Sequence, residues 1–431
     1  MRKSVLVCVL LLAVSSMLQA WNVTALLDRD DCLYKCGEQA VFTVNVKREE
    51  GDTAPLKMTM TLTHDGGNVF QEQNCEVTDN QEFVLRDTLY QPGFLRLIVI
   101  FRYNDAEGQE VKKDVQAGGG FDVEKIVPGA PEPEDFLAFW QEQLRKADET
   151  CPLEVTMTEE PYSSDKVKCY KVAINAPGGR VFCYLSIPQK TKEPQPAWVM
   201  VPGAGPGHFC GSTSETCVRL IINVHDYDPG PTQESMKERY KELTANGGYM
   251  YIGGPDREKN YYHRAIIGAV RAVRWLAQLP EVDPKHIGYK GISQGGGFGL
   301  ILGGLLDGTF QGIYCHIPAL CDHLGYKLGR ASGWPQFISN SKFKRHPDCQ
   351  TFLPYYDAVN FARHIHCPVR FTVGLIDGTC CPSSVYAAFN AIPSTDKQII
   401  NQPYVKHGIS HEIDVDSLKW IEELVTGKPW K

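Results

Sequence analysis

A serine lies between two glycines in the second half of the chain, in a turn that could expose a nucleophile. Residues 291–295 read Gly-Ile-Ser-Gln-Gly and match the pattern G-x-S-x-G. The segment 287–290 before it favours a strand, and the glycine-rich apolar segment 295–306 after it favours a helix. Such a strand–turn–helix lifts a serine hydroxyl to the carboxyl edge of a sheet, where open α/β folds bind ligands. Ser293 is therefore the candidate nucleophile.

A serine hydroxyl attacks only when a base takes its proton and an acid orients that base. After a serine turn of this kind, the acid and then the histidine follow along the chain. Asp377 comes directly after the apolar segment 369–376, so its carboxylate is expected at the same sheet edge. His407 and His411 both follow the last expected strand, 398–404, and both are candidates for the base. Position favours His411, which stands next to the closing helix expected at 415–426.

Acyl transfer also needs N–H donors for the negative charge that develops on the carbonyl oxygen. One donor is expected from the backbone amide of Gln294, the residue after the nucleophile. The second is expected from the Gly/Pro-rich loop after the strand predicted at 197–201. We favour the amide of Ala204 there, with Gly205 as the alternative.

The sequence offers no metal or other cofactor for this chemistry. Cys32 and Cys36 are close in the chain, but no C-x-x-C pair or His-rich segment accompanies them. No His, Asp or Glu cluster with ligand spacing lies beside the serine turn either. The candidate reaction is therefore expected to be metal-free.

The elements that position these residues alternate between strand and helix over residues 134–431. An amphipathic helix opens this part, and an antiparallel pair is expected at 167–174 and 181–187. Further strands are expected at 197–201, 220–224, 286–290, 369–375 and 398–404, with a long helix at 262–279. This alternation predicts a mostly parallel sheet with helices on both faces.

The part of the chain before this region reads differently. Residues 21–127 contain short Val- and Thr-rich segments separated by turn residues, which predicts a small β-sandwich of immunoglobulin-like type. Its strands are expected at 40–46, 56–63, 82–89 and 93–102. Residues 128–133, which are rich in Pro and Gly, are expected to link the two regions.

The first twenty residues have the form of a signal peptide, with a basic start, an apolar run too short to span a membrane and a small last residue, Ala20. The mature protein is therefore expected to be secreted or periplasmic, where disulfides are permitted but their pairing stays open. The 44 Lys and Arg against 51 Asp and Glu give a net charge of −7, which argues against a nucleic-acid partner. No later segment is apolar enough to span a membrane.

The chain resembles the acetyl xylan esterase / cephalosporin C deacetylase family of α/β-hydrolases over roughly residues 131–431. The segments that carry the resemblance are Asp135-Phe136 with Phe139-Trp140, Arg271-Ala272-Val273, Leu279 to Asp283, Gly291 to Gly296, Asp377 with Cys381-Pro382 and Ala387 to Asn390, and His411-Glu412. The resemblance implies the α/β-hydrolase fold, with the catalytic triad Ser293, Asp377 and His411, and it raises His411 further above His407. It also implies metal-free removal of O-acetyl groups from acetylated xylan, xylo-oligosaccharides and related small esters. The expected partner is thus an acetylated plant cell-wall glycan or oligosaccharide substrate.

Two segments depart from the family pattern. The segment 225–230 stands where the family has Arg-Gly-Gln-Gly, and Pro202-Gly203-Ala204 stands where it has His-Gly-Tyr. These departures, and the additional β-rich residues 21–127, leave open both the substrate range and whether the chain forms a homo-oligomer such as the family's hexameric ring.

Two other functions compete with an esterase. A serine peptidase on the same fold would use the same triad, but residues 21–127 are too short for the propeller that often accompanies such peptidases. A non-catalytic glycan-binding protein would need a broken triad, whereas all three residue types are present here in order. The sequence therefore favours the esterase.

Overall fold

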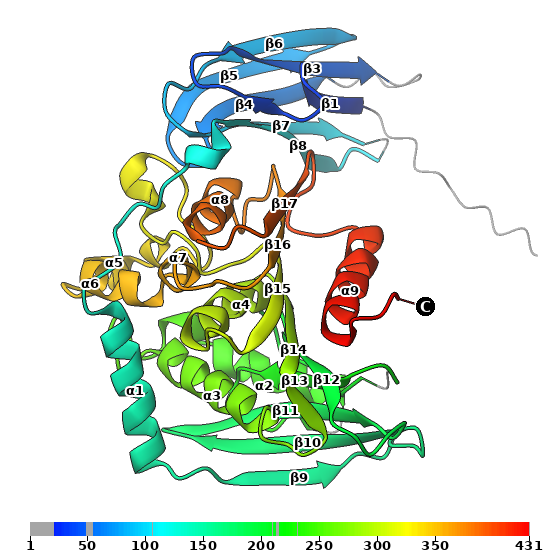
Figure 1. The fold of residues 1–431 in the computed structure, drawn as a ribbon. Coiled ribbons are helices and arrows are strands. Elements are labelled where there is room, and N and C mark those ends of the chain that lie inside the picture. The colour runs from blue at the N-terminus through cyan, green and yellow to red at the C-terminus, as the bar shows by residue number, and fades with distance from the viewer. Residues whose placement is uncertain are drawn as a thin grey trace, which may run out of the picture.

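The computed structural model describes residues 21–48, 55–105, 107–208, 210–212, 215–230 and 232–430. The expected signal peptide, 1–20, lies outside the described residues. Figure 1 shows an all-β region at the N-terminal end of the described chain and, beside it, a large sheet covered by helices. The expected α/β class with a preceding all-β region is therefore confirmed.

The N-terminal region, which we call the sandwich, consists of two small sheets. One has the strand order β1-β3-β6 and the other β2-β8-β7-β4-β5. Their bounds are β1 (Trp21–Leu27), β2 (Leu33–Tyr34), β3 (Ala40–Arg48), β4 (Leu56–His64), β5 (Val69–Val77), β6 (Gln81–Asp87), β7 (Gly93–Asn104) and β8 (Glu110–Phe121). Alternate residues of β3 are buried, as a half-buried strand requires. The four expected strands correspond to β3, β4, β6 and β7, whereas β1, β2, β5 and β8 were not predicted.

The second region is built on a nine-stranded sheet with the order β17-β16-β15-β14-β12-β13-β11-β10-β9. The bounds are β9 (Val155–Glu159), β10 (Val167–Ala176), β11 (Gly179–Pro188), β12 (Gln195–Val201), β13 (Val218–Asn223), β14 (Val282–Ile292), β15 (Phe310–His316), β16 (Val369–Gly374) and β17 (Lys397–Gln402). Strands β12 to β17 pair in parallel. The expected antiparallel pair is confirmed as β10 and β11, which are joined by the turn around Gly178.

Helices cover both faces of this sheet. Their bounds are α1 (Phe136–Thr150), α2 (Gln233–Thr244), α3 (Tyr261–Leu276), α4 (Gln294–Leu305), α5 (Ser341–Arg345), α6 (Cys349–Phe352), α7 (Ala358–Ala362), α8 (Pro382–Ala391) and α9 (His411–Thr426). Figure 1 shows α3, α4 and α8 on one face and α9 on the other. Ile421 and Val425 of α9 pack on Trp198, which closes that face with a small apolar cluster. Among the described residues, no helix combines the length and the apolar character that a membrane span needs.

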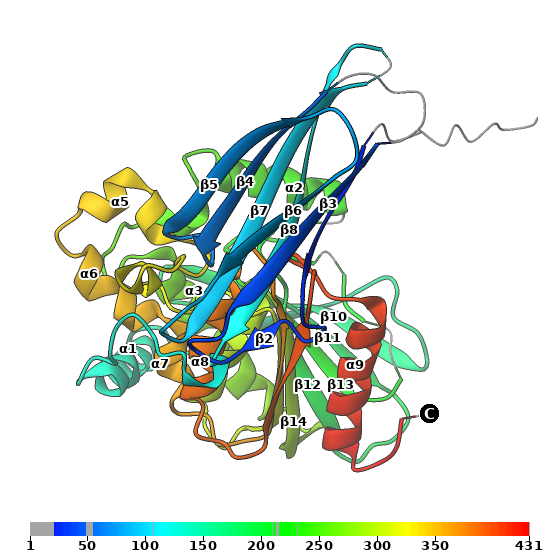
Figure 2. The same ribbon diagram turned by 90° about the horizontal axis from the view of Figure 1, so that it is seen from above.

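The parallel strands bring the ends of β14, β16 and β17 to one edge of the sheet, because parallel strands point the same way. The sandwich lies beside the β16–β17 side of this edge (Figures 1 and 2). The approach is close: a Cβ atom added to Gly118 of β8 would lie 2.2 Å from the carbonyl oxygen of Leu375. The sandwich is therefore packed directly against the segment that carries Asp377.

Candidate active site

Ser293 sits in the tight turn between β14 and α4 that its sequence pattern predicts. Its φ of 56° and ψ of −118° lie in a region that a residue with a side chain rarely adopts. The turn tolerates no side chain at its flanks, because a Cβ atom on Gly291 would lie 2.4 Å from the oxygen of Gly295. A Cβ atom on Gly295 would lie 1.8 Å from the oxygen of Val201. The two glycines thus allow the strained turn that presents the serine.

Asp377 lies just after β16 and is completely buried. Its Oδ1 accepts hydrogen bonds from the backbone N–H groups of Thr379 (2.7 Å) and Cys380 (3.0 Å). Its Oδ2 lies 2.8 Å from Nδ1 of His407. The carboxylate is therefore satisfied on both oxygens and fixed in orientation, as a buried charge requires.

His407, and not His411, lies between the acid and the serine. Its Nε2 is 3.0 Å from Oγ of Ser293, while its Nδ1 contacts Asp377. Because a carboxylate only accepts hydrogen bonds, Nδ1 carries the proton and Nε2 is left to accept from the serine hydroxyl. About a third of the His407 side chain, 31%, is exposed, so the ring is open to solvent on one side. This is the geometry of a general base beside a nucleophile.

The expectation that His411 occupies this position is wrong, and the reason is local. The closing helix was expected from residue 415, but α9 begins at His411. The side chain of Ser410 accepts a hydrogen bond from the N–H of Ile413 and caps the helix there. His411 is therefore held in the first helical turn and is exposed to solvent. A serine followed by acidic residues Glu412 and Asp414 was the sequence signal for this earlier start.

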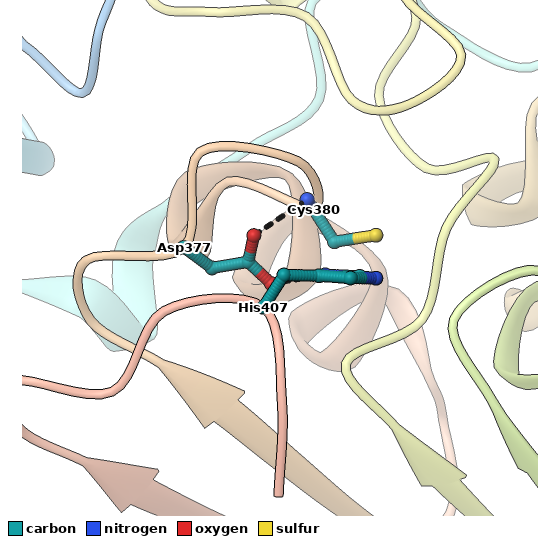
Figure 3. A group of neighbouring side chains, drawn as sticks. All are labelled: Asp377, Cys380 and His407. Atoms are coloured by element: carbon teal, nitrogen blue, oxygen red, sulfur yellow. Dashed lines mark hydrogen bonds and ion pairs between the residues drawn. The ribbon is translucent and has the colours of Figure 1, made fainter.

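Cys380 adds a thiol to the same cluster. Figure 3 shows Asp377, Cys380 and His407 gathered at the loop after β16, and their potential ligand atoms lie within 4.8 Å of one another. A Cys, His and Asp set resembles the donors of a zinc site. However, both Asp377 oxygens and both His407 nitrogens already have partners, and burial raises the pKa of the Cys380 thiol well above its ordinary value. The hydrogen bonds of Asp377 and His407 are thus those that proton transfer from Ser293 to His407 requires.

The loop expected to supply an oxyanion donor runs from β12 past the serine. A Cβ atom on Gly203 would lie 3.8 Å from Cβ of Ser293, so this loop borders the nucleophile. Ala204, the favoured donor, is the next residue and is exposed. Nε2 of His225 bonds the carbonyl of Gly205 at 2.7 Å, and the hydroxyl of Tyr227 donates to the carbonyl of Pro206 at 2.7 Å. These side chains come from the segment 225–230, whose sequence departs from the family pattern.

The other expected donor, Gln294, is the first residue of α4 and is almost fully buried. Its side-chain oxygen accepts hydrogen bonds from the hydroxyls of Tyr249 and Tyr262, the latter at 3.1 Å. These two tyrosines fix the side chain of the residue whose amide follows the nucleophile.

Two comparisons with known proteins agree on a family. The family model described as Acetyl xylan esterase (AXE1) matches residues 122–424. A curated protein, Acetyl esterase Axe7A of Xylanibacter ruminicola, is 30% identical over 405 residues, which cover 92% of this chain and 89% of that protein.

Solved structures give the same fold. The acetyl xylan esterase from Paenibacillus sp. R4 superposes with a TM-score of 0.59 at 23% identity, over 70% of this chain and 98% of that one. Acetyl Xylan Esterase 1 from Thermoanaerobacterium sp. JW/SL YS485 gives the same TM-score and identity, over 70% of this chain and 97% of that one. The chain therefore belongs to the acetyl xylan esterase family, as its motifs predicted, and is a carboxylic-ester hydrolase of the α/β-hydrolase fold.

Proposed function

We propose that this protein removes acetyl groups from acetylated xylan, xylo-oligosaccharides and related small esters through an acetyl-enzyme on Ser293. The observation that carries the proposal is the ring of His407, which contacts Ser293 through one nitrogen and Asp377 through the other. Family membership and the curated acetyl esterase relative support the acetyl ester as substrate.

In the first half-reaction, Nε2 of His407 takes the proton of the Ser293 hydroxyl while Oγ attacks the acetyl carbonyl carbon. Asp377 stabilises the imidazolium that forms. The negative charge on the carbonyl oxygen is taken up by backbone N–H groups, for which Gln294 and the loop residue Ala204 are our candidates. His407 then gives its proton to the departing sugar oxygen, which leaves the acetyl group on Ser293.

In the second half-reaction, water replaces the sugar. Nε2 of His407 takes one proton from the water as the hydroxide adds to the acetyl carbonyl carbon. Collapse of this second tetrahedral species breaks the bond to Ser293, and His407 returns the proton to Oγ. Acetate and the free enzyme are the products, and no metal or redox step is needed.

Acetate release from acetylated xylan tests this proposal. Ser293→Ala is expected to lose about 10³-fold or more in rate, because the covalent step disappears. Ser186→Ala is the matched control, since Ser186 is a buried serine on β11 far along the same sheet. Release of acetate by Ser293→Ala at the wild-type rate would refute the mechanism. Activity on 4-nitrophenyl acetate without any on acetylated xylan would refute the polymer substrate alone.

We also propose that the protein is exported. The support is the basic, apolar and small-residue pattern of residues 1–20. Expression of the full chain in a secreting bacterial host is expected to yield a protein outside the cytoplasm whose first residue is Trp21. A chain that keeps Met1 and stays in the cytoplasm would contradict export.

A further inference from the structure

The loop that carries Asp377 is held by a residue from the sandwich. Arg96 of β7 is 5% exposed, and its guanidinium reaches across to this loop. Nη1 donates to the carbonyl oxygen of Asp377 at 2.9 Å, and Nη2 donates to that of Ile376 at 2.6 Å. The other side of the guanidinium is fixed by Oε1 of Gln116 on β8, at 3.0 Å from Nε and 2.8 Å from Nη2.

A second sandwich side chain holds the far end of the same loop. Asp65 follows β4 and is completely buried. Its Oδ2 accepts the backbone N–H of Ser383, at the first turn of α8, at 2.9 Å. Burial raises the pKa of Asp65 to about 6, and the nearby positive charge of Arg96 opposes this shift. Arg96 and Asp65 therefore bind the two ends of the segment between β16 and α8.

The sandwich and the loop that carries Asp377 are closely packed at two glycines. A Cβ atom on Gly378 would lie 3.0 Å from Nη2 of Arg96, so the loop passes directly under the guanidinium. Gly118 meets the carbonyl of Leu375 in the same way, as described above. Close packing of this kind fixes the backbone on which the Asp377 side chain stands.

The sandwich also contacts the loop that carries His407. Asp114 of β8 forms an ion pair with Nζ of Lys406 at 2.6 Å, one residue before the histidine. The backbone N–H of Leu27 on β1 donates to the hydroxyl of Tyr404 at 3.1 Å. The ion pair is partly exposed and contributes little by itself. Together, these contacts link the sandwich to the loop that carries the acid and to the loop that carries the base.

We propose that Arg96 is a positioning residue, through which the sandwich holds the carboxylate of Asp377 toward His407 and so forms part of the hydrolytic machinery. The inference rests on the proposed triad. The guanidinium of Arg96 binds the backbone carbonyls of Asp377 and of Ile376, the residue before it. Because these carbonyls belong to the peptide groups on either side of the Asp377 Cα atom, their orientation sets the direction of the Asp377 side chain. A displacement of about 1 Å in a catalytic group can lower the rate by about 10²-fold.

Steady-state kinetics on 4-nitrophenyl acetate test the inference with a matched pair of variants. Arg96→Met removes the donors, and Arg102→Met on the same strand β7 removes an arginine that pairs with Glu110 of the sandwich. Arg96→Met is expected to lower kcat about 10- to 100-fold with KM changed less than about threefold, since alignment and not substrate binding is lost. Arg102→Met is expected to match the wild type, and Arg96→Lys to recover part of the loss.

Two further measurements separate positioning from a general loss of structure. The near-ultraviolet circular dichroism of each variant reports whether the protein is folded, and the downfield proton NMR resonance of the His407–Asp377 hydrogen bond reports alignment. In folded Arg96→Met this resonance is expected to broaden or vanish. If Arg96→Met does not fold, Gln116→Met leaves the arginine in place but frees one side of it, and is expected to lower kcat about threefold or more.

The outcomes distinguish this inference from the proposed function. If Ser293→Ala is inactive while folded Arg96→Met has wild-type kcat and an unchanged downfield resonance, only the positioning role is overturned. If Arg96→Met is unfolded, a wild-type kcat in Gln116→Met would overturn the positioning role instead. If Ser293→Ala keeps its activity, the triad itself is wrong.

Discussion

Nε2 of His407 lies 3.0 Å from Oγ of Ser293, a residue 114 positions earlier in the chain. The contact depends on two different strand ends, since Ser293 follows β14 and His407 follows β17, with β15 and β16 between them. A Cβ atom on Gly374 at the end of β16 would lie 2.4 Å from the carbonyl oxygen of Val405, so the histidine loop packs across that strand end. The bond between base and nucleophile is therefore set by how the parallel strands end together.

The loop beside the nucleophile gives a first prediction, which concerns His225. Burial lowers the pKa of His225 to about 4, so the ring is neutral at pH 7. Its Nε2 then donates to the carbonyl of Gly205, and its Nδ1 accepts from the hydroxyl of Tyr261 at 2.6 Å.

His225→Phe leaves that carbonyl unsatisfied and loosens the loop, so kcat on 4-nitrophenyl acetate is expected to fall about tenfold or more, short of the 10²- to 10³-fold cost of deleting an oxyanion donor. Tyr227→Phe removes one bond to the same loop and is expected to cost about fivefold, which corresponds to ~1 kcal/mol. A wild-type kcat in His225→Phe would show that the loop does not need this anchor.

Cys380 gives a second prediction, on metals and thiols. Its thiol is buried and protonated, and its neighbours Asp377 and His407 are bonded to one another. Chelation with EDTA is therefore expected to leave the rate on 4-nitrophenyl acetate unchanged, and Cys380→Ser is expected to stay within about tenfold of wild type, since the thiol is not a member of the proposed triad. Loss of activity on chelation and its return with added zinc would mean that this cluster works as a metal site.

A third prediction concerns stability in acid. Burial lowers the pKa values of six histidines among the described residues: to about 4 for His64, His225 and His323, to about 3 for His316, and also for His208 and His263. The unfolded chain protonates histidine near pH 6.5. Between about pH 6.5 and 4, the unfolded state thus binds more protons than the folded state. These groups therefore lower the free energy of unfolding as the pH falls through that range.

Three buried carboxyls, among them Asp322, act in the opposite direction because burial raises their pKa values. Burial raises the pKa values of Asp65 and Asp357 to about 6, so the folded state binds more protons there than the unfolded state. A single variant separates the two effects. His316→Gln is expected to reduce the acid-side slope of unfolding free energy against pH by up to about 1.4 kcal/mol per pH unit, the value for one proton. Urea unfolding from pH 4.5 to 9 measures this; equal slopes in variant and wild type would refute it.

Local patterns predicted Ser293 and Asp377 correctly as residues of one cluster, because each follows a strand end directly. The position of a residue directly after a strand depends mainly on that strand, so a local sequence pattern is enough to predict it. The same reasoning failed for the base, since His407 and His411 both lie in the segment after β17. The helix cap at Ser410 decides between them, because α9 begins at His411 and not at residue 415, where the helix was expected.

Other features could not be predicted from local pattern. β5 is polar and exposed over most of its length, and it lies at a sheet edge, so it has no alternation to detect. The bond between Arg96 and Asp377 joins a strand of the sandwich to the loop after β16, 281 positions further along the chain. A buried arginine in a strand shows no partner in sequence, because its partners are backbone carbonyls, which every residue has.

The rates of two histidine variants on 4-nitrophenyl acetate show whether His407 is the general base. His407→Ala is expected to lower kcat/KM about 10³-fold or more, as Ser293→Ala does, because members of a triad act as a unit. The double variant Ser293→Ala/His407→Ala is expected to be hardly slower than either single variant. His411→Ala is the matched control four residues away, and it is expected to stay within about threefold of wild type, since an exposed residue of a helical first turn affects mainly local stability. An inactive His411→Ala together with an active His407→Ala would show that His407 is not the general base.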